Sequence, residues 1–180
     1  MKHSFFSFAI FALAGASIAI GQDAHVSGKL NSTDAQFIRD VMASGHHEVE
    51  MGQLALKRSN DPEVKSLAQR LVNDHTAAGK KLEEIAKSNG LLTTSPAIEA
   101  RKDVDTRTDQ NRLTDSHLDT MQGAEFDKAW AKQMVANHKA GIAKFEAEQK
   151  DAQNADLQNF VSMTLPTLRE HLSQAQALDK

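Results

Sequence analysis

The chain has 180 residues, no cysteine, and 21 basic against 24 acidic side chains, which give a formal net charge of −3. Without cysteine it can form no disulfide and carry no lipid attached through a thiol. The mild charge, with acidic and basic residues interspersed along the chain, argues against nucleic acid as a partner. The length suits one domain with a sizeable core.

The first 21 residues, MKHSFFSFAIFALAGASIAIG, have the pattern of a secretory signal peptide. A lysine precedes an apolar run at 5–14, and the small residues of Ala19-Ile20-Gly21 predict cleavage before Gln22. The run is short for a membrane span, so an uncleaved N-terminal anchor is the less favoured alternative. We expect a periplasmic protein, and peripheral association with the outer membrane stays open.

After a predicted linker at 22–32, the domain at 33–180 is rich in alanine, leucine, lysine, glutamate and glutamine, which predicts helices throughout. The expected core helices span about 34–58, 62–88, 124–150 and 155–178. Ser32, Thr33 and Asp34 offer an N-cap for the first of them.

Local signals mark the other helix ends. Asp61 followed by Pro62 is a strong start signal for the second helix, and Gly90 is expected to close it. Pro166 lies inside the fourth helix, where it should cause a kink or a break.

Residues 91–123 form the most polar part of the chain, with apolar positions too sparse for a core helix. We interpret this segment as a solvated crossover that could hold a helix at about 96–121. Two helical hairpins joined by one such connection predict an all-α fold, a ferritin-like four-helix bundle with a long, partly helical crossover.

Each predicted core helix has an apolar stripe that is interrupted once, near its middle, by a residue able to bind metal. These residues are Glu48, His75, His138 and His171. At ~1.5 Å per residue they lie roughly 18–27 Å from the adjoining hairpin turn, in helices about 35–40 Å long. One carboxylate and three imidazoles at a shared level predict the ligand set of a single transition-metal ion, with zinc, copper and iron as candidates.

A structural interpretation of the same residues stands beside the metal site. A histidine on an apolar stripe is often a core residue bonded to a carboxylate, and a Glu48–His75 ion pair would give the same pattern in the first hairpin. Asp74 and Glu170 each precede a stripe histidine and are expected to accept hydrogen bonds from an imidazole. Core methionines such as Met134 are expected to be filler rather than copper ligands.

Several motifs resemble the DUF4142 family of exported bacterial proteins. They are Asp74-His75, Phe126-Asp127, His138 and the run LP-x-L-x-x-H ending at His171, within a similarity that extends from about Thr33 to Leu178. The resemblance implies a ferritin-like fold and export, since family members are often labelled outer-membrane or periplasmic proteins, but no activity is settled for them. The loosely similar exported family DUF305 is associated with metal handling, which supports the metal hypothesis by analogy.

The sequence departs from the di-iron ferritins. Those proteins use Glu-x-x-His motifs, whereas the residues three before the stripe histidines are here Val72, Val135 and Leu168. Phosphate-binding loops and nucleophile elbows are also absent from the sequence, so we expect a binding protein and not an enzyme. The favoured function is binding or sequestration of a transition metal during envelope stress. The alternative is a metal-free structural or interaction module of the envelope.

Overall fold

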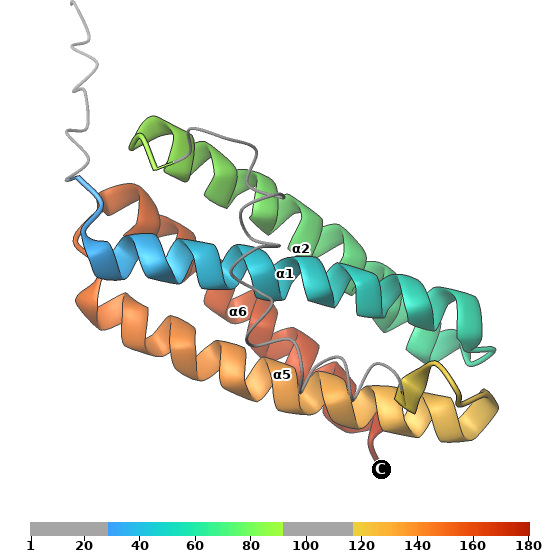
Figure 1. The fold of residues 1–180 in the computed structure, drawn as a ribbon. Coiled ribbons are helices and arrows are strands. Elements are labelled where there is room, and N and C mark those ends of the chain that lie inside the picture. Colours follow the sequence, from blue (N-terminus) through green and yellow to red (C-terminus); the bar gives the residue numbers. More distant parts are fainter. Residues whose placement is uncertain (1–28, 92–116) are drawn as a thin grey trace, which may run out of the picture.

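The computed structural model describes residues 29–91 and 117–180. Its main helices are α1 (Ser32–Arg58), α2 (Pro62–Ser88), α5 (Gly123–Asp151) and α6 (Ala155–Leu178). They form an all-α four-helix bundle, as the sequence predicts (Figure 1). The predicted signal peptide, most of the predicted linker and most of the crossover lie outside the described residues. None of the helices described is both long enough and apolar enough to cross a membrane.

The helix boundaries follow local capping chemistry. α2 and α6 span the predicted residues, and α5 is one residue longer at each end. α1 begins two residues before the prediction because its N-cap is Asn31. The Asn31 side chain accepts hydrogen bonds from the N–H groups of Thr33 and Asp34, and the Asp34 carboxylate accepts one from the N–H of Asn31. Gly90 closes α2 as predicted, with a positive φ of 69°.

α6 continues through Pro166, so of the kink or break predicted there the break does not occur. Proline lacks an N–H and therefore leaves the carbonyl of Ser162, four residues earlier, without its helical partner. Both residues are exposed, so water can bond that carbonyl in place of the missing N–H.

The helices form two antiparallel hairpins, α1–α2 and α5–α6, that lie side by side, with α1 and α5 running in opposite directions (Figure 1). At one end of the bundle, Asn89 at the end of α2 accepts a hydrogen bond from Asn154, the N-cap of α6. At the other end, Arg58 lies 3.9 Å from Asp119 and donates to the carbonyl of Met121, just before α5. These end contacts hold the two hairpins in register.

The buried apolar residues form two clusters, one in each half of the bundle. The first surrounds Phe126 and Trp130 near the α1–α2 turn, and the second surrounds Phe37 and Phe145 near the α5–α6 turn. On every helix, the residue predicted for the metal site falls between the two clusters. We term these four residues the polar layer: Glu48, His75, His138 and His171.

α1 approaches both α2 and α5 closely at Met51 and Gly52, on the side of the polar layer that faces the α1–α2 turn. A Cβ on Gly52 would lie 2.8 Å from Cγ2 of Val72 and 2.9 Å from the carbonyl oxygen of Ala68. The neighbouring carbonyl of Met51 accepts a 3.0 Å hydrogen bond from the buried indole N–H of Trp130. Helix α1 can keep its close approach to α2 only if position 52 has no side chain.

Gly52→Ala should therefore destabilise the bundle, by roughly 1–3 kcal/mol, because the added methyl must displace the backbone of α2. Gly79→Ala is the matched control, since Gly79 is helical and nothing lies within 4 Å of the position its Cβ would take. Alanine at 79 should raise the free energy of unfolding by about 0.5–1 kcal/mol. Denaturant unfolding measures both, and equal effects at the two positions would contradict the close approach.

Two buried carboxyl groups meet where the start of α1 packs against the end of α5. Asp34 and Glu148 are 1% and 5% exposed, and each has a buried oxygen without a hydrogen-bond partner. Burial, together with the charge of Asp34 and a hydrogen bond to it, raises the pKa of Glu148 to about 7. In mildly acidic solution Glu148 is therefore protonated in the folded protein, although it would be ionised in the unfolded chain.

This acidic pair should make the folded state less stable as the pH rises. A carboxyl group whose pKa is raised on folding contributes stability below its ordinary value of 4.5, and the contribution is lost as the pH rises through about 7. Glu148→Gln cannot ionise, so its stability relative to wild type should improve by up to ~3 kcal/mol between about pH 5 and about pH 8 in urea unfolding. A difference that stays constant over this range would contradict the raised pKa.

Candidate metal centre

Three histidines from three helices meet in the polar layer. His75 comes from α2, His138 from α5 and His171 from α6, and their ring centroids lie 5.3–5.8 Å apart. One nitrogen of each ring lies within 4.8 Å of the others. His138 and His171 are 3% and 1% exposed, and His75 is half-buried. We term this group the His triad.

A hydrogen bond to the backbone fixes which nitrogen of His138 carries the hydrogen. Its Nδ1 lies 2.9 Å from the carbonyl oxygen of Met134, one turn earlier on α5. A carbonyl oxygen can only accept, so Nδ1 is the donor. In the neutral ring, Nε2 then has a free lone pair.

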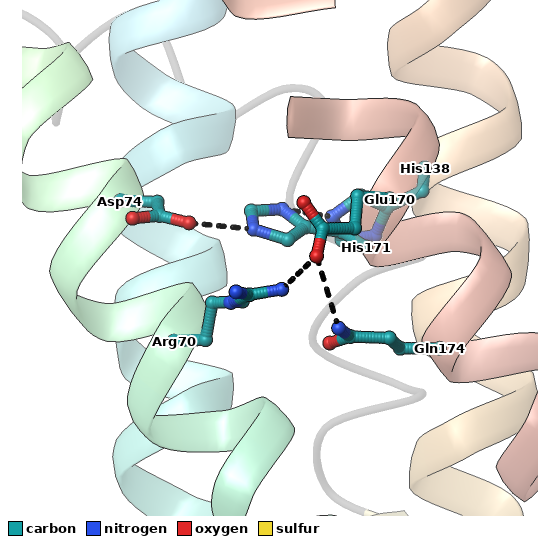
Figure 2. Close-up of polar contacts among 6 residues, drawn as sticks. All are labelled: Arg70, Asp74, His138, Glu170, His171 and Gln174. Carbon is teal, nitrogen blue, oxygen red and sulfur yellow. Dashed lines mark hydrogen bonds and ion pairs between the residues drawn. The ribbon is translucent and has the colours of Figure 1, made fainter. Parts of the chain in front are cut away.

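In His171 the hydrogen is on the other ring nitrogen, Nε2. Its Nε2 donates to Oδ2 of Asp74 on α2 over 2.8 Å, as Figure 2 shows, so the lone pair of the neutral ring is on Nδ1. The Asp74 side chain is 41% exposed at the surface of the bundle. This carboxylate therefore connects a buried ring to the solvent and sets the direction in which its lone pair points.

The two lone pairs face each other across the centre of the bundle. His138 Nε2 and His171 Nδ1 are 3.3 Å apart, a separation at which one nitrogen normally donates a hydrogen to the other. Under the assignments above neither nitrogen carries a hydrogen, so the contact is repulsive. A positive species bound by both nitrogens, either a proton or a metal ion, would make it attractive.

His75 adds a third nitrogen to the site. Its Nε2 is buried and has no hydrogen-bond partner, and its ring packs against both other rings. Its Nδ1 faces α1, where it lies 4.0 Å from the position that a Cβ on Gly45 would take. Leaving a buried polar atom unbonded costs on the order of 1–3 kcal/mol, which makes this nitrogen a candidate ligand atom.

Burial keeps the three rings neutral. It lowers the pKa of His75 to about 3 and that of His138 to about 4, and it also lowers the pKa of His171 despite the neighbouring carboxylate of Asp74. Repulsion between protonated rings acts in the same direction. Near neutral pH the His triad therefore offers uncharged lone pairs, the form in which imidazole binds metal ions.

Glu48 lies in the polar layer but outside the His triad. Its Oε1 accepts a 2.8 Å hydrogen bond from the side-chain amide of Asn137, and its Oε2 is buried without a partner. Burial raises the pKa of Glu48 to about 7, although the bond from Asn137 opposes the shift. The structure thus brings three of the four predicted site residues together, and the Glu48–His75 ion pair considered from the sequence is replaced by a Glu48–Asn137 bond.

Polar side chains of α2 and α6 surround the outer side of His171 (Figure 2). Glu170 pairs with Arg70 of α2 and accepts a 3.4 Å hydrogen bond from Gln174. The prediction of a carboxylate that orients an imidazole is therefore confirmed for Asp74, whereas Glu170 is engaged with these other partners.

Asn137 was not among the residues predicted for the site. The residue directly precedes His138, so its side chain points about 100° away from that of His138 on the helix. The sequence pattern alone therefore places Asn137 on the solvent-exposed side of the apolar stripe. Its partner Glu48 is on a different hairpin, 89 residues away along the chain. The shared level of the two side chains in the bundle is the signal that could have paired them.

Solved structures share this fold at low sequence identity. A DUF305 fragment from Deinococcus radiodurans matches with a TM-score of 0.70 and 13% identity, over 84% of this chain and 97% of that one. CopM in its Cu(I)-bound form matches with a TM-score of 0.61 and 16% identity, over 80% of this chain and 93% of that one. A DUF305 protein from Streptomyces coelicolor, described as a predicted secreted protein, matches with a TM-score of 0.65 and 15% identity, over 79% of this chain and 88% of that one.

Identities this low establish a common fold and nothing more. No curated protein matches the sequence significantly. The family described as "Domain of unknown function (DUF4142)" matches residues 21–178, which is nearly all of the chain after the predicted signal peptide. The protein therefore belongs to the DUF4142 family.

Proposed function

We propose that this protein binds and sequesters a transition-metal ion at the His triad. The observation that carries the proposal is the 3.3 Å approach of His138 Nε2 to His171 Nδ1, both without a hydrogen, beside the ring of His75, whose Nε2 is unpartnered. A metal ion can accept the lone pairs of His138 and His171 and, when the hydrogen of His75 is on Nδ1, that of His75 as well. A single proton between two rings would leave the third nitrogen unsatisfied.

The spacing of the nitrogens suits such an ion. Metal–nitrogen bonds of ~2.0–2.1 Å at tetrahedral angles place two ligand nitrogens ~3.3 Å apart. His138 and His171 already have this separation. The separations in the triad extend up to 4.8 Å, so we expect the ring of His75 to close in when the ion binds.

Copper and silver are the first ions to test. CopM, which has the same fold, has structures with Cu(I), Cu(II) and Ag bound, and this supports a metal-related function without identifying ligands in the present chain. Imidazole is also a good ligand for zinc and iron, so both belong in the comparison. We place the activity in the periplasm on the strength of the predicted signal peptide at 1–21. Metal excess is the envelope stress that such sequestration would relieve.

Metal titration of the chain without an affinity tag should show one tight ion per chain that depends on the His triad. His138→Gln and His171→Gln should each weaken binding by more than ~100-fold, because losing a ligand costs more than losing one of its outer hydrogen-bond partners. His46→Gln is the control, since His46 is exposed and pairs with Glu50 on the surface of α1. Circular dichroism checks that each variant keeps its helices.

The same ion should stabilise the fold, because the triad joins α2 of one hairpin to α5 and α6 of the other. An ion present at a hundred times its dissociation constant should add about 2.7 kcal/mol to the free energy of unfolding of wild type and less than about 0.4 kcal/mol to that of His138→Gln. If wild type binds no ion, or if the triad variants bind as tightly as wild type, the metal-free structural module becomes the better account.

Asp74 should control binding by fixing the lone pair of His171. In Asp74→Ala the ring can move its hydrogen to Nδ1 and donate it to Nε2 of His138, which would consume both lone pairs. We expect metal affinity to fall ~10- to 100-fold. Asp74→Asn keeps an acceptor for Nε2–H of His171, so its metal affinity should fall less.

Nitrogen NMR shifts of the His171 ring report the tautomer directly. They should show hydrogen on Nε2 in wild type and Asp74→Asn, and on Nδ1 in Asp74→Ala. An unchanged tautomer in Asp74→Ala would show that Asp74 does not direct the lone pair.

A further inference from the structure

The His triad is a largely buried site of low charge. Its rings are neutral, and their hydrogen bonds within the described residues bring in one ionised group, the carboxylate of Asp74. Arg70 and Glu170 form an ion pair nearby, and their two charges act on His171 in opposite directions. The fixed charge at the site is therefore about −1.

A buried cation has to be matched to that charge. The cost of moving an ion from water into protein grows with the square of its charge, so a divalent ion loses roughly four times as much hydration energy as a monovalent ion of equal size. A monovalent ion beside Asp74 leaves the site neutral. A divalent ion leaves a buried charge of about +1 unless another anion enters.

Glu48 is the carboxyl group that could change this balance. It lies in the polar layer, where it accepts a hydrogen bond from Asn137. Measurements repeated with Glu48→Gln, which cannot carry a negative charge, therefore isolate the contribution of Asp74.

We infer that the His triad selects a soft monovalent cation, of the Cu(I) or Ag(I) class, over a divalent cation with the same electron configuration. The inference rests on the proposed metal-binding function and adds the charge of the ion to it. Three neutral nitrogen ligands, a buried position and a single carboxylate at the edge match one positive charge.

Ag(I) and Cd(II) are compared because both ions have the same filled d shell and differ by one unit of charge. Dissociation constants for the chain without an affinity tag are compared with those of free imidazole for the same two ions. The binding that is lost in His138→Gln belongs to the triad, which separates it from Ag(I) held by methionines elsewhere. We expect the triad to favour Ag(I) at least ~10-fold more strongly than free imidazole does, in wild type and in Glu48→Gln alike.

Two surface variants should change this selectivity in opposite directions. Arg70→Gln leaves Glu170 unpaired and adds negative charge near His171, which helps a divalent ion twice as much as a monovalent one. Glu170→Gln leaves Arg70 unpaired and has the opposite effect. We expect the preference for Ag(I) to fall roughly two- to five-fold in the first variant and to rise by a similar factor in the second. Both side chains are substantially exposed, so neither change should disturb folding.

The outcomes separate the inference from the function on which it rests. Triad binding that favours Cd(II), or that discriminates no better than imidazole, would overturn the inference while leaving a metal site in place. If Arg70→Gln and Glu170→Gln change the preference for Ag(I) in the same direction, the inference is also overturned while the metal site remains. If both ions bind His138→Gln as tightly as wild type, the proposed function fails as well.

Discussion

Two imidazole nitrogens without hydrogens lie 3.3 Å apart at the centre of the bundle, and this contact constrains the placement of the helices around it. Left alone, it is repulsive. It persists because the other nitrogen of each ring donates a hydrogen bond, in His138 to the carbonyl of Met134 and in His171 to the carboxylate of Asp74. The three helices that bear the rings must therefore stay in register, and the contacts at both ends of the bundle maintain that register.

The polar layer divides the core into two apolar halves. Those halves supply the packing that stabilises the bundle, while the layer adds buried groups that are not fully bonded. Leucines at these positions would leave no polar atom unbonded, so the polar layer lowers the stability of the bundle relative to an apolar one. The triad takes one ring from the first hairpin and two from the second, so an ion there would hold the hairpins together. The same geometry makes binding sensitive to any slip of one hairpin past the other.

Much of this arrangement could be predicted from the sequence. Apolar spacing gave the four helices, and the single interruption of each stripe placed Glu48 and the three histidines at one level. Capping residues gave both ends of α2, because Asp61-Pro62 and Gly90 act locally. The start of α1 was missed by two residues, since several polar residues in a row could each cap a helix and only the local geometry selects Asn31.

The remaining features depend on contacts between distant segments. Which ring nitrogen carries the hydrogen depends on a partner on another helix in the case of His171, and no spacing rule reveals it. Glu48 bonds Asn137 for the same reason, because helix rotation and not position along the chain decides which side chain it meets. Periodicity therefore predicts the level of a residue in a bundle well, and its bonding partner poorly.

The proposed site requires that three specific nitrogens share one ion. Crystals of the metal-loaded protein, measured at the absorption edge of the bound element, locate that ion directly. With copper or zinc, we expect one anomalous peak per chain, ~2.0–2.1 Å from Nε2 of His75, Nε2 of His138 and Nδ1 of His171. A peak at any other group of side chains, or none at full loading, would contradict it.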